Sequence, residues 1–408
     1  MHDNAFGSLI APVTTADFFS RYFEREVLHV ARDDAAAVAG LYAVGDVENA
    51  LILGANEPEH FALIKTGEEA LDTEAFTTAR AVIRYRSARK SSRALVDPRA
   101  VLDAFARGYT LNIKDATAYH PPLAQLCSRI QAQLGAYAQV NVYFTPPRAQ
   151  GFEIHYDTHD TLIVQIEGDK HWEVHAPVVP LPLEMQPFSA AAHVGKLDEP
   201  REYRLQAGDV LYIPHGFPHC AKTAERRSLH LTFAISPIRL IDLVDALVQL
   251  AALGDPALRA ALPPGWHRDP TFSARTSAQL AALLPRAIAP ERLPLAAELA
   301  FNDLFGATRT TAAHAFDTLA AFESLEPGTR IQLRDDTPFQ LRDRGERLDI
   351  VLAGKVVTIP GLAREAFARL EAGPATFADL DRLVPQGLGK TFLRTLVLNE
   401  LVVAGEPS

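Results

Sequence analysis

Two stretches of this sequence decide the predicted fold: residues 150–157, QGFEIHYD, and residues 208–219, GDVLYIPHGFPH. In an extended chain, residues two apart project to the same face, so His155 and Asp157 share one side. The second stretch ends on another histidine, His219, at the end of a predicted strand. Two imidazoles and one carboxylate on one side of a metal ion leave its opposite positions open, as in non-haem Fe(II) sites. We therefore predict His155, Asp157 and His219 as metal ligands.

The surrounding strands strengthen this prediction. A His-x-Asp motif alone is weak evidence, because the chain contains 14 histidines. Between the two stretches, residues 161–174 predict a strand, a tight turn at Gly168-Asp169 and a second strand. Residues 227–235 predict another alternating strand. Metal ligands on successive antiparallel strands of a small barrel are what a double-stranded β-helix, or cupin, provides.

Three motifs follow one another in the order HxD, LxxQxEGxKxW and GDxLYxPxGxxH. In this order they resemble the Jumonji-C oxygenases, and within them they are most similar to the ribosomal oxygenases, which are cupin-type protein hydroxylases. The resemblance implies Fe(II) and 2-oxoglutarate as cofactors and hydroxylation of a protein or peptide side chain, with conversion of 2-oxoglutarate to succinate and CO₂. It also makes an Arg or His of a ribosomal protein the first substrate class to test.

Four further residues are candidates for binding the cofactor. An interior lysine needs a charge partner, and in the resembled enzymes a basic residue at the position of Lys170 binds the distal carboxylate of 2-oxoglutarate. The alternative is a solvated lysine beside a turn. Asn141 and Tyr143 share the strand face that meets the cofactor in the resembled family, although both could instead satisfy buried backbone groups. Ser236 ends the final strand and matches a position where the family adds a hydroxyl to the same carboxylate.

One insertion and five spare histidines lie near this predicted site, the histidines being His159, His171, His175, His215 and His230. His159 is two residues after Asp157, so in an extended chain it projects to the same face as His155 and Asp157. We interpret it as pocket lining or surface. His215 is expected at the rim, where contact with substrate is the alternative. The Pro-rich residues 177–202 form an insertion between barrel strands, and a loop of this length is usually functional or disordered. At the barrel mouth it would shape a substrate groove.

With 408 residues, the chain is long enough for two or three domains. We predict an α+β architecture with a Jumonji-C catalytic domain at 1–237, a helical region at 238–327 and a winged-helix-like domain at 328–408. The helical region is strongly apolar and must bury its faces against something. Because related oxygenases dimerise through such a region, we predict a homodimer, with packing inside the chain as the alternative.

Charge argues against nucleic acid as a partner. The formal net charge is −10. Between residues 330 and 408, Lys and Arg number 11, and Asp and Glu also number 11. The predicted recognition helix offers only Lys390 and Arg394, whereas a phosphate-contacting surface should be basic. A local basic cluster at residues 84–93 is interpreted as a solvated face, with an acidic partner such as RNA as the alternative.

Composition also bounds the cellular setting. The chain has 2 cysteines, too few for a disulfide framework, which fits a reducing compartment. No apolar run approaches membrane-spanning length, and the first residues have no secretory pattern. We therefore predict a cytoplasmic protein without a membrane partner.

Two rival functions remain at this point. The same chemistry could act on a biosynthetic peptide, an amino acid or a tRNA nucleoside. A different class is a metal-binding cupin that acts as a non-catalytic scaffold. Turnover of 2-oxoglutarate distinguishes the enzyme from the scaffold, and a substrate screen distinguishes the enzymes from one another.

Overall fold

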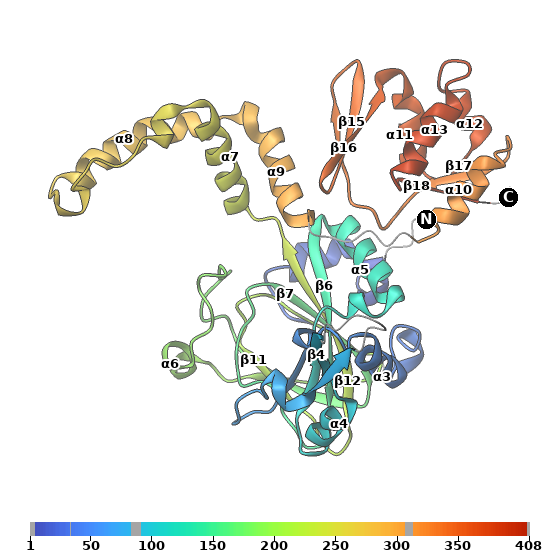
Figure 1. Ribbon diagram of the computed structural model, residues 1–408. Helices are drawn as coiled ribbons and strands as arrows, with labels where there is room; N and C mark the ends of the chain where they lie inside the picture. Colours follow the sequence, from blue (N-terminus) through green and yellow to red (C-terminus); the bar gives the residue numbers. More distant parts are fainter. Residues whose placement is uncertain (1–4, 33, 83–90, 307–312, 406–408) are drawn as a thin grey trace. The chain divides into compact units, whose positions relative to one another are not determined.

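A computed structural model of the chain is shown in Figure 1 and describes residues 5–32, 34–82, 91–306 and 313–405. The chain divides into two compact units, one made of residues 2–133 and 138–236 and the other of residues 134–137 and 237–408. The basic residues Arg84, Arg86, Arg89 and Lys90 lie outside the described residues, as does the side chain of Arg93.

The first unit is built on a seven-stranded sheet. Its strands, in spatial order, are β1 (Leu28–Val30), β10 (Val210–Ile213), β7 (Asp160–Glu167), β12 (Ser228–Pro237), β6 (Ala136–Thr145), β5 (Thr110–Ile113) and β2 (Phe61–Ile64). Neighbours such as β10 and β7 pair antiparallel, with Tyr212 opposite Leu162. Strand β6 alternates buried and half-buried residues over most of its length, because one face of the strand packs on the interior.

A second sheet of three strands closes the barrel. It consists of β11 (His219–Lys222), β8 (Asp169–Val174) and β9 (Arg201–Gln206). An apolar cluster joins the two sheets and contains Ile163, Trp172, Val174, Leu205, Leu211 and Ile213. This pair of antiparallel sheets around one core is the barrel that the alternating strands predict.

The Gly168-Asp169 turn carries the chain from one sheet to the other. Strand β7 pairs with β10 on one side and with β12 on the other, so neither edge is left for β8. Gly168 has φ 72°, and a Cβ there would lie 1.9 Å from the carbonyl oxygen of Arg227. Only glycine fits this turn, and the turn delivers Lys170 to the sheet opposite β7.

Helices and a small ribbon complete the first unit. The helices are α1 (Ala5–Ile10), α2 (Thr15–Asp17), α3 (Val44–Leu53), α4 (Pro98–Ala106), α5 (Pro121–Leu134) and α6 (Ala190–His193). The ribbon pairs β3 (Thr77–Val82) with β4 (Ser91–Val96). Helix α5 buries Leu123, Cys127 and Ile130 on one face, which fits its predicted apolar stripe. Helix α6 lies in the long connection between β8 and β9.

The second unit begins with helices α7 (Leu240–Gly254), α8 (Phe272–Ala287), α9 (Leu293–Phe305) and α10 (Ala315–Glu323). Helix α7 packs on α9 through Ala246, Leu247 and Ala296. Much of its remaining apolar surface is uncovered, since Leu240 is 83% exposed and Leu253 is 77% exposed. In the described part of the chain, no helix is both long enough and apolar enough to cross a membrane.

The C-terminal part of this unit has its own core. Its elements are β13 (Arg330–Leu333), β14 (Gln340–Asp343), β15 (Arg347–Leu352), β16 (Lys355–Pro360), α11 (Arg364–Glu371), β17 (Ala375–Thr376), α12 (Phe377–Asp381), α13 (Gly389–Leu398) and β18 (Val402–Gly405). The strands form two three-stranded sheets, β17-β13-β18 and β14-β15-β16. Side chains of all three helices fill the core, among them Phe367, Leu380 and Leu393.

Candidate metal and cofactor site

Backbone pairing brings the three predicted metal ligands together. His155 and Asp157 lie on the extended segment between β6 and β7, and His219 is the first residue of β11. His155 and His219 form an antiparallel bridge, in which each backbone N–H donates to the other residue's carbonyl at 3.2 and 2.7 Å. The N–H of Gly216 donates to the carbonyl of Asp157 at 2.9 Å. The main chain therefore sets the side chains of both segments side by side.

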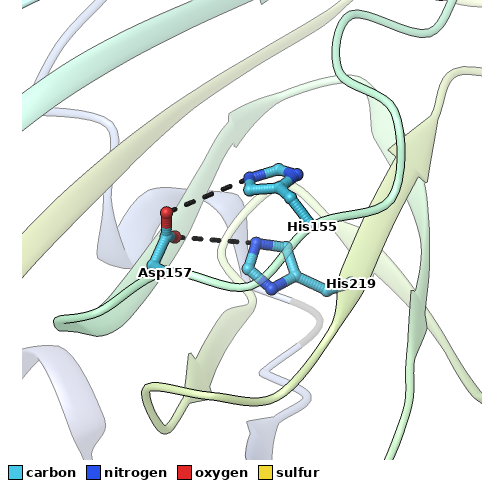
Figure 2. Close-up of side chains that lie close together, drawn as sticks. All are labelled: His155, Asp157 and His219. Carbon is cyan, nitrogen blue, oxygen red and sulfur yellow. Dashed lines mark ion pairs between the residues drawn. The ribbon is translucent and has the colours of Figure 1, made fainter. Parts of the chain in front are cut away.

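The ligand atoms of the three side chains face one another, as Figure 2 shows. His155 Nε2 lies 4.0 Å from Asp157 Oδ1, and His219 Nε2 lies 3.7 Å from Asp157 Oδ2. All three candidate ligand atoms fall within 4.8 Å of one another, close enough to surround one small cation. Two imidazole nitrogens and one carboxylate on a single side match the donor set of facial-triad iron sites.

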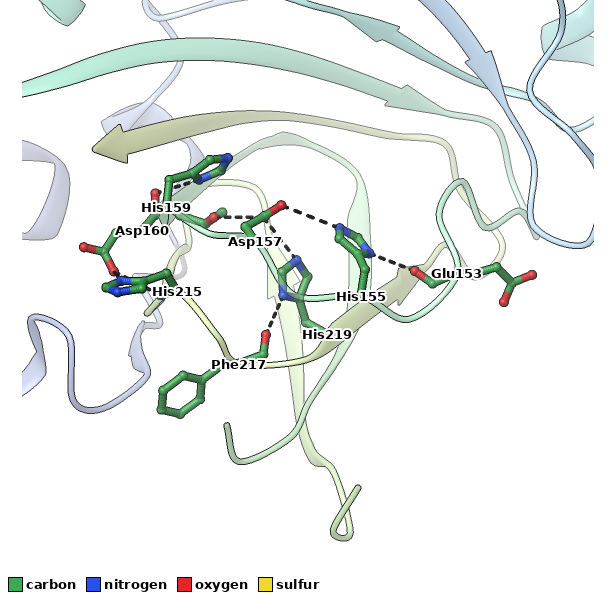
Figure 3. Close-up of polar contacts among 9 residues, drawn as sticks. Glu153, His155, Asp157, His159, Asp160, His215, Phe217 and His219 are labelled. Atoms are coloured by element: carbon green, nitrogen blue, oxygen red, sulfur yellow. Dashed lines mark hydrogen bonds and ion pairs between the residues drawn. The ribbon is translucent and has the colours of Figure 1, made fainter. Parts of the chain in front are cut away.

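Hydrogen bonds to backbone carbonyls orient both imidazoles (Figure 3). His155 Nδ1 lies 2.8 Å from the carbonyl oxygen of Glu153, and His219 Nδ1 lies 2.9 Å from that of Phe217. A carbonyl oxygen can only accept, so Nδ1 carries the proton in each ring. The lone pair then sits on Nε2, the atom that faces Asp157, which is the tautomer a metal requires.

Neighbouring charges keep Asp157 ionised, and burial above all keeps His219 neutral. Burial alone would raise the pKa of Asp157, but the imidazoles of His159, His219 and His155 outweigh it and lower that pKa. The Thr161 hydroxyl adds to the effect by donating to Asp157 Oδ2 at 3.2 Å. Burial, followed by the neighbouring His155, lowers the pKa of His219 to about 4. Both groups are therefore in the protonation state that metal binding needs.

A cavity of about 170 Å³ opens beside the three ligands. Because a water molecule occupies about 30 Å³ in the liquid, this space holds a small organic molecule rather than a single water. Both sheets contribute to its lining, which consists of Thr110, Asn141, Tyr143, Gly151, Phe152, His155, Asp157, His159, Thr161, Lys170, Trp172, His219, Cys220, Ala221, His230 and Thr232.

Lys170 lies in this cavity as a buried cation without a carboxylate partner. Its residue is 4% exposed, and Nζ donates to Thr145 Oγ1 at 3.2 Å. Among the described residues, no carboxylate oxygen lies within ion-pair distance of Nζ. Burial lowers the pKa of Lys170 to about 7. An ammonium in such a place is stable only when an anion joins it, so the cavity is built to receive a negatively charged group.

Further polar atoms in the cavity also lack partners. Trp172 Nε1, His230 Nδ1 and Thr232 Oγ1 are buried and have no hydrogen-bond partner in the described ranges. Buried polar atoms are normally satisfied, so these three indicate a polar ligand. The sequence reasoning did not identify Trp172 or Thr232 as site residues, and it placed His230 only as a spare histidine near the site. The alternation of β12 contained a signal, because residues 230 and 232 share one face of that strand.

Two of the other predicted cofactor residues, Asn141 and Tyr143, lie at the cavity and line it. Asn141 Oδ1 also accepts from the backbone N–H of Asp115 at 3.0 Å, so this side chain satisfies a backbone group, while its contact with the cofactor stays a prediction. Tyr143 stacks on His230 with ring centroids 5.0 Å apart. Burial, and then the charge of Asp157, raises the pKa of Tyr143 well above its ordinary value.

Ser236 is not brought to the cavity. It lies near the end of β12, beyond Ile235, and is not among the lining residues. The hydroxyls beside Lys170 come instead from Thr145, which bonds Nζ, and from Thr110, which donates to Thr145 Oγ1 at 3.2 Å. The hydroxyls nearest the ammonium therefore belong to β5 and β6, and the predicted contact of Ser236 with the cofactor is not supported by its position.

Two of the spare histidines, His159 and His215, have different surroundings. His159 lines the cavity, as one of its two interpretations expected. His215 does not lie at the rim: it is 2% exposed, and its Nδ1 lies 3.0 Å from the buried carboxylate of Asp160. The interpretation of His215 as a rim residue was wrong. Its side chain turns inward toward Asp160, the first residue of β7.

Comparison with known proteins agrees with this geometry. Residues 113–243 match the family model of the JmjC domain. Ribosomal oxygenase 1 of Gallus gallus is 31% identical over 265 residues, which cover 63% of this chain and 42% of that protein. The human protein of the same name is 33% identical over 234 residues, covering 56% and 34%. This chain therefore spans less than half the length of these curated relatives.

A third relative and several solved structures extend the comparison. The bifunctional lysine-specific demethylase and histidyl-hydroxylase NO66 of Drosophila mojavensis is 31% identical over 235 residues, covering 56% of this chain and 24% of that protein. Escherichia coli YcfD superimposes with a TM-score of 0.54 at 14% identity, over 97% of this chain and 99% of that chain. YcfD described as a ribosomal oxygenase in complex with cobalt and 2-oxoglutarate gives a TM-score of 0.52 at 14% identity, over the same shares of both chains.

At this identity the solved structures establish a shared fold, and the sequence relatives establish common ancestry over the aligned residues. The match to the family model includes all three predicted metal ligands. The chain therefore contains a JmjC domain of the cupin type and is homologous to the ribosomal oxygenases.

Proposed function

We propose that this chain is an Fe(II)- and 2-oxoglutarate-dependent oxygenase that hydroxylates a side chain of a protein substrate. One observation carries the proposal: a buried lysine, which has no anionic partner among the described residues, shares a single cavity with a facial set of two imidazoles and one carboxylate. A cavity built for a metal alone has no need of Lys170, and one built for an anion alone has no need of the triad.

The residues present fit both groups. His155, Asp157 and His219 would hold Fe(II) through two nitrogens and one oxygen, which leaves positions open for other ligands. Lys170 would bind the far carboxylate of 2-oxoglutarate, with its ammonium held by the Thr145 hydroxyl and with the Thr232 hydroxyl, which has no partner among the described residues, beside it in the cavity. When bound, iron would activate O₂ with 2-oxoglutarate as the co-substrate: one oxygen atom would enter the substrate side chain and the other succinate, as 2-oxoglutarate loses CO₂.

The protein's own contribution is to orient these groups and limit water. Backbone carbonyls hold the lone pairs of both imidazoles toward Asp157. Tyr143, Trp172 and His230 pack against one another as rings on the cavity wall. Such a wall excludes water from the reacting groups, and its low polarity strengthens the attraction between the Lys170 ammonium and a bound carboxylate.

The substrate would enter beside the connection between β8 and β9. Tyr156, located between two of the ligands, donates its hydroxyl to the carbonyl of Gln186 at 2.8 Å. Its ring also packs on Phe188, with centroids 5.3 Å apart. The connection between β8 and β9 is therefore anchored directly to the segment that carries His155 and Asp157. We propose that residues 177–202 form the wall of a groove for an extended peptide.

The homology indicates which proteins to test first. The relatives carry the names ribosomal oxygenase and histidyl-hydroxylase. We therefore propose an Arg or His side chain of a ribosomal protein as the substrate. The same site on a small amino acid or a nucleoside would not need an anchored wall of this length.

The remaining parts of the chain would support this enzyme. We propose the domain limits 1–237, 238–327 and 328–408 and a homodimer formed by the helical region, supported by the uncovered side chains Leu240 and Leu253. The C-terminal elements would form a winged-helix-like module with a structural role, given its balanced charge. A cytoplasmic location is supported by Cys127 and Cys220, which are both free thiols.

The proposal is tested by succinate formation. Fe(II)-loaded protein, prepared without oxygen, is mixed with 2-oxoglutarate and O₂, with and without single purified ribosomal proteins. Stimulation by one of these proteins, together with a gain of one oxygen atom on its peptide, is the expected result. Tight iron binding with no succinate under any condition would favour the scaffold instead.

A further inference from the structure

A second imidazole–carboxylate pair, Asp160 and His215, lies outside the cavity and beside the metal ligands, to their left in Figure 3. Asp160 is 0% exposed and His215 is 2% exposed, and neither residue lines the cavity. Asp160 Oδ1 accepts from the backbone N–H of His215 at 3.1 Å and contacts His215 Nδ1 at 3.0 Å. One carboxylate oxygen thus holds both the main chain and the side chain of the same residue.

The pair joins the two segments that carry the ligands. Asp160 opens β7 directly after the segment with Asp157, and His215 lies in the turn between β10 and the β11 strand that starts at His219. The same turn is tied once more to the triad, because the N–H of Gly216 donates to the carbonyl of Asp157. Loss of the pair would therefore loosen both segments together.

Asp160 has few other ways to satisfy its charge. Within the described part of the chain, no Lys or Arg lies within ion-pair distance of its carboxylate, and His215 is its ion-pair partner. The carboxylate also faces the Tyr212 phenol, whose pKa is raised first by burial and then by Asp160. A fully buried carboxylate is stable only where hydrogen-bond donors are held against it. Asp160 therefore depends on the backbone N–H and the imidazole of His215, and it holds His215 in place in return.

We propose that Asp160 and His215 are positioning residues, which hold Asp157 and His219 at the separation that a single divalent cation requires. The inference rests on the proposed function in one respect, since it takes the triad to bind a divalent metal. Outer residues that orient metal ligands typically change metal affinity about 10- to 100-fold when they are removed.

The test measures Co(II) binding, with Co(II) as an air-stable stand-in for Fe(II). Calorimetry gives the dissociation constant, and the visible ligand-field spectrum of Co(II) reports the geometry of its ligands. We expect Asp160→Ala and His215→Leu to weaken Co(II) binding at least about tenfold and to alter the spectrum. We expect His215→Asn to keep near-wild-type binding, because its amide nitrogen occupies the place of Nδ1 along the side chain and can still donate.

Asp209→Ala is the matched control. Asp209 is also a buried carboxylate of the same unit, 4% exposed, and it accepts from the backbone N–H groups of Arg32 and Gln206 at 2.8 and 2.9 Å. It lies just before β10, at the opposite end of that strand from His215. This variant should melt earlier than the wild type while binding Co(II) with the same affinity and spectrum.

The outcomes separate the two claims. Wild-type protein that binds no Co(II) would overturn the proposed function and this inference with it. Wild-type binding with unchanged affinity and spectrum in His215→Leu would overturn the inference alone, as would equal losses in Asp209→Ala and Asp160→Ala. Should Asp160→Ala not fold, the comparison of His215→Leu with His215→Asn decides, because equal losses in those two variants contradict the positioning role.

Discussion

His155 and His219 are paired through their main chains: the N–H of His155 donates to the carbonyl of His219 at 3.2 Å, and the N–H of His219 donates to the carbonyl of His155 at 2.7 Å. Their ring centroids lie 4.7 Å apart as a consequence of this bridge. The spacing of the two imidazoles is therefore set by main-chain atoms, which side-chain replacements leave in place.

Replacement of the ligands should accordingly remove activity and spare the fold. We expect His155→Ala, Asp157→Ala and His219→Ala each to lower succinate formation at least about a hundredfold. Their melting temperatures without metal should stay within about 4 °C of the wild type, because no main-chain hydrogen bond is lost. Turnover assays and thermal melts of the same preparations check this. Normal activity in any of the three variants would contradict the ligand assignment.

Lys170→Met should raise the stability of the ligand-free protein and weaken its use of 2-oxoglutarate. Methionine has a similar length and no charge to bury, so the protein without ligands should melt at a higher temperature. The concentration of 2-oxoglutarate needed for half-maximal turnover should rise at least about tenfold, while Co(II) affinity stays unchanged. An unchanged requirement for 2-oxoglutarate would place the carboxylate contact elsewhere. The matched control is Lys222→Met, since Lys222 pairs with Glu173 on the exposed side of the neighbouring strand.

The binding of 2-oxoglutarate should weaken as the pH rises above 7. Burial lowers the pKa of Lys170 to about 7, so the protein without ligands loses this proton as the pH passes that value. The cofactor's carboxylate needs the charged ammonium, and binding must therefore take up a proton at higher pH. His230 does not mask the effect, because burial and the nearby Lys170 keep its pKa far below the ordinary histidine value.

Calorimetry at pH 8 in buffers of different ionisation enthalpy measures this proton uptake, with Mn(II) in place of iron. We expect uptake approaching one proton per 2-oxoglutarate and an association constant that falls about tenfold per pH unit above 7. Lys170→Arg should abolish the pH dependence, because a guanidinium stays charged throughout. Equal pH dependence in wild type and Lys170→Arg would assign the effect to another group.

Charged substitutions on α7 should separate the predicted dimer. Leu240 and Leu253 are 83% and 77% exposed, which leaves apolar surface that a second copy would cover. The double variant Leu240→Glu/Leu253→Glu should elute as a monomer in light-scattering chromatography. Leu102→Glu serves as the control, since Leu102 is 67% exposed on α4 and should not affect association. A monomeric wild type would disprove the dimer.

The C-terminal module should not bind DNA. Helix α13 carries only Lys390 and Arg394 as basic residues. Full-length protein should show no salt-dependent DNA affinity, and Lys390→Ala/Arg394→Ala should behave as the wild type in fluorescence anisotropy. Binding that weakens steeply with salt and is lost in the double variant would indicate phosphate contacts.

The sequence predicts what neighbouring residues determine locally. The parity of His155 and Asp157, the strand that ends at His219 and the alternation within the barrel strands depend on short segments, and each is recognisable there. The cavity position of Lys170 was also expected, because the motif around it is specific. What the sequence could not show is which sheet a strand joins: Gly168-Asp169 looks the same in a hairpin as in the crossing that the structure contains.

Partners distant in the sequence account for the other differences. His215 stands between a proline and a glycine, which suggests an exposed turn, and only Asp160 from another strand makes it a buried residue. Ser236 and Thr232 lie on the same face of β12, but Ser236 is four residues further along the strand. Thr232 lines the cavity, whereas Ser236 lies beyond it. Such distances depend on strand register, which parity alone does not give.

The most direct measurement of the central claim is the visible charge-transfer absorption that forms when 2-oxoglutarate chelates protein-bound Fe(II) without oxygen. We predict this band in the wild type, its absence in Asp157→Ala, and its appearance only at raised 2-oxoglutarate concentrations in Lys170→Met. Fe(II) bound by the wild type with no spectral change on addition of 2-oxoglutarate would contradict the account.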